Sequence, residues 1–178
     1  MYRKILTLSG LVALLTLGLA SSALADAKPI QERVRHALVM LPYYSVFDDL
    51  SFQIEGDSVV LMGKVTRPTL KSDAEAVVRR IEGIERVENK IQVLPLSPND
   101  DRLRLDLYRA IYFNPDFTRY AIRAVPPIHI IVENGHVTLV GVVATEMDSN
   151  LAFVRAKTTP GSFSVTNLLR VEGSDPHR

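Results

Sequence analysis

The second half of this chain repeats its first half at a constant offset of 78 positions, and this repeat constrains the fold more than any single motif. The clearest markers are Gly63 and Gly141, each of which stands inside an alternating apolar run. The positions that superimpose without a gap are Val59, Leu61, Gly63, Val65, Ala74, Gly83, Val87, Asn89, Ile91 and Val93 on Val137, Leu139, Gly141, Val143, Ala152, Gly161, Val165, Asn167, Leu169 and Val171. The chain is therefore predicted to contain two copies of one small module.

The hydrophobic periodicity of the first copy predicts the element order α-β-β-α-β. Apolar residues at helical spacing mark its helices, and strict alternation marks its strands. The predicted elements are a helix from Pro29 to Leu41, strands 50–55 and 58–65, a helix around 74–81 and a strand 87–93. The predicted fold class is α+β, with two tandem α-β-β-α-β modules, each a small mixed three-stranded sheet packed with two helices.

The second copy is expected to differ from the first in two places. Its first helix should be capped by Asp100 or Asp101 and run to about Phe113. About six extra residues precede its hairpin, around 124–128, and Asn134-Gly135 predicts the hairpin turn. Its second helix is expected to be shorter or rotated, because Pro160 interrupts the pattern.

The N-terminal segment belongs to neither copy and has the features of a signal peptide. Arg3 and Lys4 precede an apolar run, and Ala23-Leu24-Ala25 provides a small-x-small cleavage site. A retained membrane anchor is the alternative, but the run is short for a span of about 20 apolar residues. Cleavage is predicted before Asp26, and the predicted location is the periplasm.

The predicted organisation is therefore a signal peptide (1–25), module 1 (26–95), a linker (96–100), module 2 (101–172) and a tail (173–178). The sequence has no cysteine, so disulfides and thiolate metal sites are excluded, as is a lipid-modified cysteine. Without the signal peptide, 19 basic residues face 20 acidic ones. This balance does not favour nucleic acid as a partner.

The repeated pattern resembles the BON domain, the bacterial osmotic-stress and nodulation family. The pattern is Val-x-Leu-x-Gly-x-Val, an alanine-bearing helix, and Gly-x-x-x-Val-x-Asn-x-Ile/Leu-x-Val. It spans 59–65, Ala74 and 83–93 in the first copy, and 137–143, Ala152 and 161–171 in the second. The resemblance extends from about 30 to 171. It implies a tandem periplasmic protein associated with envelope integrity and osmotic stress, with phospholipid binding as the proposed activity and no catalytic residues to carry over.

Two pairs of repeated residues are predicted to be structural. Gly63 and Gly141 lie inside strands, where we expect the second helix of each module to cross closely over them. Asn89 and Asn167 occupy apolar positions of the last strands. A buried amide needs hydrogen-bond partners, so each is expected to bond a strand end or loop of its own module.

The strongest candidate for a functional surface is the first helix of module 2 together with the loop after it. Arginine and tyrosine alternate there, and Tyr108 and Tyr112 are predicted at outer or boundary positions. Such residues suit a membrane interface, where rings lie among headgroups and guanidinium groups pair with phosphates. The predicted lipid-binding residues are Arg102, Arg104, Tyr108, Arg109, Tyr112, Arg119 and Arg123. The alternative is an ordinary helix whose aromatic residues pack against the sheet.

No catalytic or metal constellation is apparent, since the four histidines share no ligand spacing and no phosphate-binding or nucleophile motif occurs. We therefore expect a non-enzymatic protein without a cofactor. The leading hypothesis is peripheral binding to an anionic phospholipid membrane surface. An alternative is a protein-interaction module of the envelope that accepts a partner strand at a sheet edge, without lipid affinity. A third possibility is a stress protein that binds unfolded chains.

Overall fold

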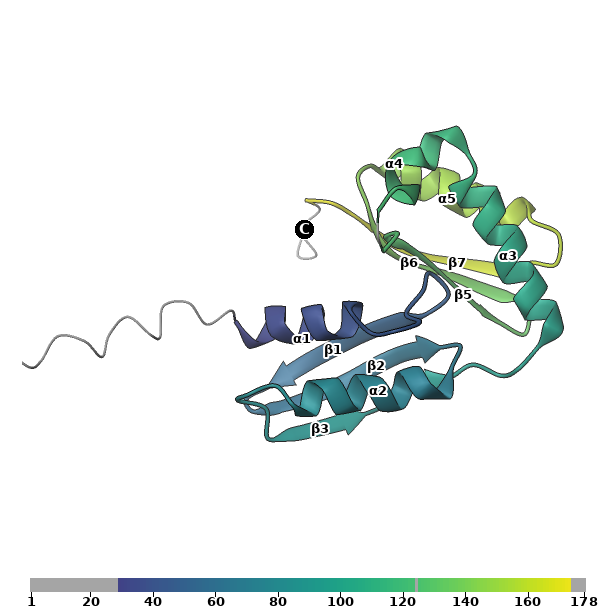
Figure 1. Cartoon of the computed structure of the whole chain (residues 1–178). Helices are drawn as coiled ribbons and strands as arrows, with labels where there is room; N and C mark the ends of the chain where they lie inside the picture. Colours follow the sequence, from purple (N-terminus) through teal and green to yellow (C-terminus); the bar gives the residue numbers. More distant parts are fainter. Residues whose placement is uncertain (1–28, 124, 174–178) are drawn as a thin grey trace, which may run out of the picture.

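The computed structural model describes residues 29–123 and 125–173 and contains two modules packed against each other (Figure 1). The predicted signal peptide, 1–25, and the predicted tail beyond residue 173 lie outside these ranges. Within them, no helix combines the length and the apolar character that a membrane crossing requires.

Module 1 has the predicted element order, with its last strand divided in two. Its elements are α1 (Ile30–Val39), β1 (Asp49–Glu55), β2 (Ser58–Val65), α2 (Pro68–Arg79), β3 (Arg86–Asn89) and β4 (Gln92–Val93). β1 is antiparallel to β2, which is parallel to β3 and β4 and therefore lies in the middle of the sheet. Val34 of α1, Leu61 of β2 and Ala74 of α2 are buried in the same hydrophobic core. Both helices therefore cover the same face of the sheet.

Module 2 repeats this topology. Its elements are α3 (Pro98–Tyr112), the 3-10 turn η1 (Pro115–Phe117), α4 (Thr118–Ala121), β5 (Ile128–Glu133), β6 (His136–Val143), α5 (Glu146–Thr158) and β7 (Ser164–Val171). The sheet order is β5-β6-β7, with β5 antiparallel and β7 parallel to the central β6. The predicted fold class, two tandem α-β-β-α-β modules with small mixed sheets, is confirmed.

The start of α3 differs from its predicted form. Pro98 begins the helix, and Ser97 caps it by accepting a hydrogen bond from the Asp100 N–H at 3.2 Å. Asp100 is almost fully buried, and its carboxylate accepts hydrogen bonds from the Asn134 and Gly135 N–H groups, both at 2.8 Å. The predicted Asp100 or Asp101 cap is therefore wrong, because Asp100 instead ties α3 to the β5–β6 turn.

The expectation of a short second helix in module 2 is also wrong. α5 has 13 residues, against 12 in α2. Thr145 and Asp148 form a reciprocal capping box that stabilises its first turn. Pro160 follows the C-cap residue Thr159, so its missing N–H removes no hydrogen bond from the helix.

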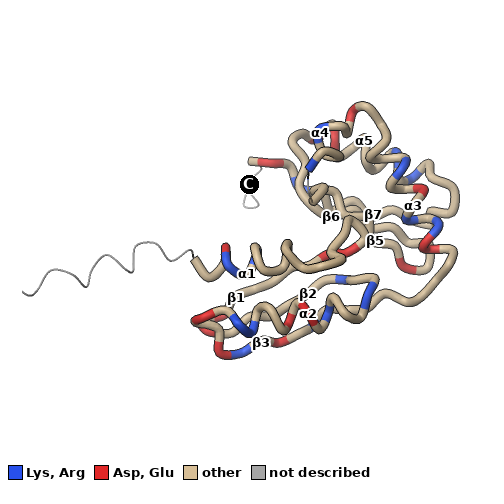
Figure 2. Tube along the Cα trace, in the orientation of Figure 1, with Lys and Arg blue, Asp and Glu red and all other residues tan. Residues whose placement is uncertain are grey.

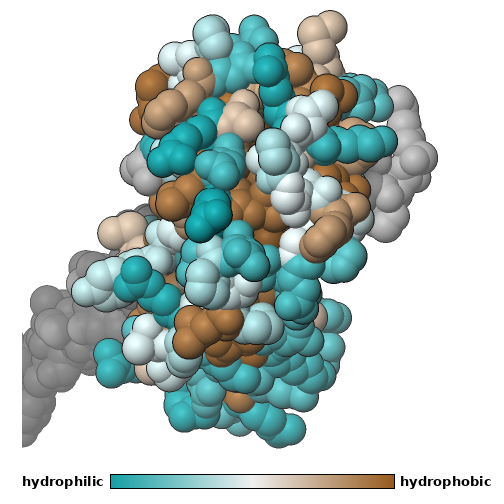
Figure 3. Space-filling view, turned by 90° about the vertical axis from the view of Figure 1, so that its right-hand side faces the viewer, coloured by the Kyte–Doolittle hydropathy of each residue, from teal (hydrophilic) through white to brown (hydrophobic). Residues whose placement is uncertain are grey.

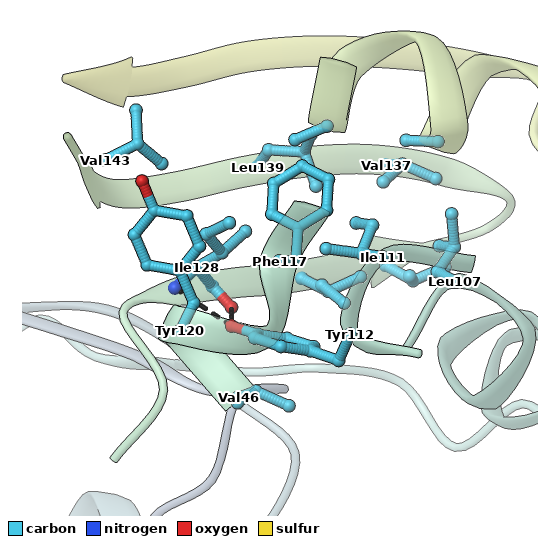
Figure 4. Packing of buried hydrophobic residues seen from close by; sticks show 14 of the residues in the cluster. Val46, Leu107, Ile111, Tyr112, Phe117, Tyr120, Ile128, Val137, Leu139 and Val143 are labelled. Carbon is cyan, nitrogen blue, oxygen red and sulfur yellow. Dashed lines mark hydrogen bonds between the residues drawn. The ribbon is translucent and has the colours of Figure 1, made fainter. Parts of the chain in front are cut away.

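The extra residues of module 2 form η1 and α4, which close one end of the core. Phe117 and Tyr120 are almost fully buried and lie beside Val143 and Leu139 of β6 in Figure 4. This segment, 115–121, begins earlier than the predicted position around 124–128. Local turns with a buried aromatic residue in each therefore enlarge the core of module 2 relative to that of module 1.

Gly63 and Gly141 allow a close approach, but the approaching group is not the second helix. Their φ angles are +120° and +131°. A Cβ at Gly63 would lie 2.1 Å from the Asp49 carbonyl oxygen, and one at Gly141 would lie 1.8 Å from that of Pro127. Asp49 is the first residue of β1, and Pro127 directly precedes β5. The predicted crossing of the helix over these glycines is thus wrong, and the contact is between backbones within the hairpin.

We expect the substitution Gly141→Ala to destabilise module 2 by about 2–4 kcal/mol, because it adds a backbone clash to an unfavourable φ. Urea unfolding followed by circular dichroism measures this change. Gly56→Ala is the matched control: Gly56 also has a positive φ, +64°, but a Cβ there meets nothing within 4 Å. An equal loss of stability in the two variants would contradict the clash.

Candidate functional site

The structure divides the predicted lipid-binding residues into buried and exposed groups. Arg104 and Tyr112 are each only 4% exposed. The Arg104 guanidinium donates a hydrogen bond to the Val132 carbonyl oxygen at 2.7 Å and forms an ion pair with Asp101. Arg104 therefore connects α3 to β5 and does not lie on a membrane-facing surface.

Tyr112 has a similar structural role. Its hydroxyl donates to the Ile128 carbonyl oxygen at 2.6 Å and accepts from the Ile128 N–H at 3.0 Å, as the dashed lines in Figure 4 show. Burial raises the pKa of its hydroxyl above the usual range, so Tyr112 stays neutral. The predicted outer position of Tyr112 and the predicted membrane role of Arg104 are both corrected by their burial.

The other predicted residues remain accessible but do not form a single face. Arg102 is exposed near the start of α3, whereas Arg109 lies in its last turn. Arg119 and Arg123 are exposed in and after α4. Tyr108 is half-buried, and its ring lies 5.1 Å from the ring of Tyr112 and 5.9 Å from that of Phe113.

The structure adds two apolar residues at this end of module 2 that are not among the predicted lipid-binding residues. Phe113, the C-cap residue of α3, is 73% exposed, and Ile122, the C-cap residue of α4, is 80% exposed. Met40 is the C-cap residue of α1 and is 68% exposed, so both modules expose a large apolar side chain where their first helix ends. We call Arg109, Phe113, Arg119, Ile122 and Arg123 the α3–α4 end.

A buried carboxylate holds α4 in place at this end. Asp148 accepts hydrogen bonds from the Tyr120 hydroxyl at 2.9 Å and from the Thr145 hydroxyl at 2.6 Å, and it forms an ion pair with Arg119. Desolvation acts to raise the pKa of Asp148, but the hydrogen bonds from Thr145, Tyr120 and Arg119 together lower it below its usual value. The charged form of Asp148 thus connects α4 to the start of α5.

The two modules are joined by the loop between α1 and β1, residues 40–48. Val46 is 7% exposed and belongs to the core of module 2, although the chain places it in module 1. Its carbonyl oxygen accepts a hydrogen bond from the Ile130 N–H at 2.7 Å, at the outer edge of β5. Lys64 of β2 and Glu133 of β5 form a second contact between the modules, an ion pair. The loop therefore acts as a short additional partner of the module 2 sheet.

Asp48 gives this loop its conformation. Its carboxylate is fully buried and accepts hydrogen bonds from the Ser45 hydroxyl at 2.7 Å and from the Thr66 N–H and hydroxyl at 2.7 and 2.8 Å. The Asp48 carbonyl oxygen lies 2.6 Å from Nδ1 of His129 in β5. One residue therefore ties the loop to the end of β2 and to module 2.

Asn89 and Asn167 are hydrogen-bonded within their own modules, as predicted, but their amides bond the second helices and not a loop or strand end. Their side-chain amides donate to the carbonyl oxygens of Lys71 in α2 and Ser149 in α5, respectively. Their side-chain oxygens accept from the N–H two residues further along the strand, at 3.1 and 3.2 Å. Each asparagine thus connects its last strand to the second helix of its module.

Among the described residues, no group of three His, Cys, Asp or Glu side chains could hold a metal ion. The accessible features are instead a mixed basic and apolar helix end and a packed junction between two small α+β modules.

The family model of the BON domain matches residues 26–95 and 99–173, so the chain belongs to the BON domain family and contains two copies of the domain. Proteins of this family are typically associated with the cell envelope. No curated protein matches the chain.

Among solved structures, the chain is similar to the C-terminal domain of CdsD, a structural protein of the type III secretion system of Chlamydia trachomatis. That match has 12% sequence identity and a TM-score of 0.30, and it covers 82% of this chain and 98% of the other. A second CdsD structure matches with 11% identity and a TM-score of 0.28, over 79% and 90% of the two chains.

We expect Asp148→Asn to destabilise module 2 by about 1–3 kcal/mol at neutral pH, since the charge-assisted hydrogen bonds are weakened. A lowered pKa in the folded state means that the stabilisation is present above the unfolded pKa of about 3.9 and is lost as the pH falls below it. Urea unfolding at pH 7 and pH 3 measures both effects.

The control for this substitution is Asp116→Asn, at an exposed aspartate of η1. The Asp148→Asn protein should lose less stability than the wild type on acidification, whereas Asp116→Asn should behave as the wild type. An unchanged pH dependence in Asp148→Asn would show that Asp148 is not a source of acid sensitivity.

We expect Val46→Asp to separate the modules, because it places a carboxylate against the apolar core of module 2. Burial of an unpaired charge should cost about 2–4 kcal/mol. Small-angle X-ray scattering should show a larger radius of gyration than in the wild type. Val154→Asp, at a position of α5 that is 52% exposed, should leave the radius unchanged. A compact Val46→Asp protein would contradict a dominant role of this contact.

Proposed function

We propose that this protein is a non-enzymatic periplasmic binding protein of the cell envelope that contacts anionic phospholipid membranes peripherally, in a role linked to envelope integrity or osmotic stress. The contact surface is the α3–α4 end of module 2. The supporting observation is the exposure of Phe113 and Ile122, 73% and 80%, beside the exposed Arg109, Arg119 and Arg123.

The side-chain chemistry of the α3–α4 end suits the boundary between headgroups and acyl chains. An aromatic ring such as that of Phe113 and an aliphatic side chain such as that of Ile122 gain free energy when they leave water. Guanidinium groups pair with phosphate oxygens in a bidentate manner. Two apolar contacts flanked by three arginines therefore fit shallow and reversible insertion.

The electrostatic attraction is modest, because acidic residues lie close to the arginines. Figure 2 shows Lys and Arg interspersed with Asp and Glu along α3 and α4. Arg109 lies 3.2 Å from Asp106, and Arg119 is paired with Asp148. Arg123 has no ion pair among the described residues and is, within the α3–α4 end, the arginine most available to a phosphate. A basic residue near an anionic surface contributes about 1 kcal/mol.

An apolar row extends this surface toward module 1. The ring of Phe47, in the loop between the modules, lies 6.2 Å from that of Tyr108, which in turn contacts Phe113. In the same loop, Tyr43 is 70% exposed, and the Arg67 guanidinium lies 4.8 Å from the centre of its ring. Both modules can therefore contribute aromatic and arginine side chains to one membrane contact.

The alternative function, capture of a partner strand, has less support. An added strand needs several consecutive free main-chain groups at a sheet edge. On β5, the Ile130 N–H is already bonded to Val46. On β7, the Leu169 N–H is bonded to the Asn167 side chain. Both edges of the module 2 sheet are thus partly occupied, and we favour the membrane contact.

Co-sedimentation of the chain from Asp26 with liposomes tests the proposed membrane contact. Anionic liposomes should bind the protein at low salt, with less binding at physiological salt and little binding to zwitterionic liposomes. Arg123→Glu should weaken the binding about thirtyfold, because it removes one positive charge and adds one negative charge at about 1 kcal/mol each. Phe113→Ser should weaken it by a similar factor, because it removes the apolar anchor.

The matched control is Arg102→Glu, at an exposed arginine of the same helix but at its opposite end, which should retain most of the binding. An equal loss in Arg102→Glu would show that net charge and not the α3–α4 end determines the affinity. Absence of wild-type binding to anionic liposomes at low salt would refute the proposed function and favour a protein partner.

A further inference from the structure

A groove of about 400 Å³ lies between the two modules, on the sheet faces that carry no helices. Module 1 contributes Met62 and Lys64 of β2, and module 2 contributes Ile131 of β5, Val140 of β6 and Leu168 of β7. These residues alternate with the core residues of their strands. Figure 3 shows hydrophobic atoms in the middle of the view, surrounded by hydrophilic ones, near the level at which the modules meet.

The repeat places equivalent positions of the two modules in the same groove. Met62 corresponds to Val140, and Lys90 corresponds to Leu168, at the offset of 78 residues. Ile131 is only 5% exposed but belongs to neither core cluster, so its burial comes from the junction between the modules. The groove thus exists only because the helix-free faces of two modules lie opposite each other.

The lining favours an alkyl chain as the occupant. Met62, Ile131 and Val140 offer apolar side chains and no backbone edge, because the groove runs along sheet faces. A peptide in this position would leave its amides without partners, which is unfavourable, whereas an alkyl chain has no polar group to satisfy. The volume also falls within the range of small-molecule sites, about 300–1,000 Å³.

A lysine at one rim of the groove favours a ligand with an anionic head group on that side. Lys90 of the β3–β4 edge lines the groove, and Asp49 lies on β1, at the opposite edge of the same sheet. Lys90 is paired with Glu88 at 3.0 Å, but both side chains are 57% exposed, so this pair is weak and Lys90 can turn to a ligand. Lys64 is held by Glu133 and is less available.

We infer that this groove binds a single-chain anionic amphiphile, a long-chain fatty acid, with its alkyl chain over Met62, Ile131, Val140 and Leu168 and its carboxylate at Lys90. The inference does not rest on the proposed membrane contact, which involves the helical side of module 2. It adds a site for a monomeric lipid to a protein whose membrane contact lies elsewhere.

Isothermal titration calorimetry with myristate, below its critical micelle concentration, tests this site on the chain from Asp26. The wild type should bind myristate saturably, at one site, and should bind tetradecyltrimethylammonium, which has the same chain length and a cationic head group, more weakly. Leu168→Asp should lower the affinity for myristate at least tenfold. Leu168 is 55% exposed, so this substitution should not unfold the protein.

Three further variants separate the contributions of the apolar lining, of Lys90 and of the α3–α4 end to ligand binding. Val154→Asp replaces a similarly exposed apolar residue on α5 and should bind myristate as the wild type does. Lys90→Glu should weaken binding of myristate but not of tetradecyltrimethylammonium. Phe113→Ser should keep its affinity for myristate even though it loses binding to liposomes.

Three results would overturn the inference. One is the absence of saturable binding of myristate to the wild type, and another is wild-type affinity in both Leu168→Asp and Lys90→Glu. The third is loss of myristate binding in Phe113→Ser, which would place the amphiphile at the α3–α4 end. A failure of liposome binding alone would leave the groove unaffected, so the two proposals can be distinguished.

Discussion

The contact of Val46 with module 2 is the interaction on which the arrangement of the two modules depends. Val46 is buried in the core of the second module, and its carbonyl oxygen is bonded to the Ile130 N–H at the edge of β5. The buried carboxylate of Asp48 holds the loop in the conformation that allows this contact. Because an apolar contact and a main-chain hydrogen bond occur together, the loop joins the modules more specifically than a surface ion pair such as Lys64–Glu133 can.

This junction separates the two proposed binding surfaces of the protein. The helices of module 2 cover one face of its sheet and present the α3–α4 end to solvent, where apolar C-cap residues lie beside arginines (Figure 1). The other face of the sheet lies opposite the sheet of module 1 and encloses the groove. A membrane surface is a flat partner and suits the protruding end, whereas a groove between sheets suits a slender ligand. A tandem repeat is needed only for the second of these.

The repeat and its alternation were sufficient to predict the element order, the hairpin turn at Asn134-Gly135 and the family, because these depend on local periodicity and turn chemistry. The N-cap at Ser97 was missed because Asp100 and Asp101 are equally good N-cap residues by sequence. The Asp100 side chain instead accepts hydrogen bonds from the β5–β6 turn, which is distant in sequence. The length of α5 was underestimated from Pro160, because this proline lies beyond the C-cap residue Thr159 and removes no hydrogen bond from the helix.

The sequence alone determined that the chain forms two α+β modules of the BON family, with basic and aromatic residues concentrated in the first helix of the second module. Only the tertiary structure decided which of those residues are exposed. Arg104 and Tyr112 are buried because the Val132 and Ile128 carbonyl oxygens, distant in sequence, lie within hydrogen-bonding distance of them. Phe113 and Ile122 are exposed because the helices end beneath them and no other described element covers them. The hydrophobic periodicity of a sequence indicates which side of a helix is apolar. The exposure of a side chain depends on which residues from elsewhere in the chain pack against it.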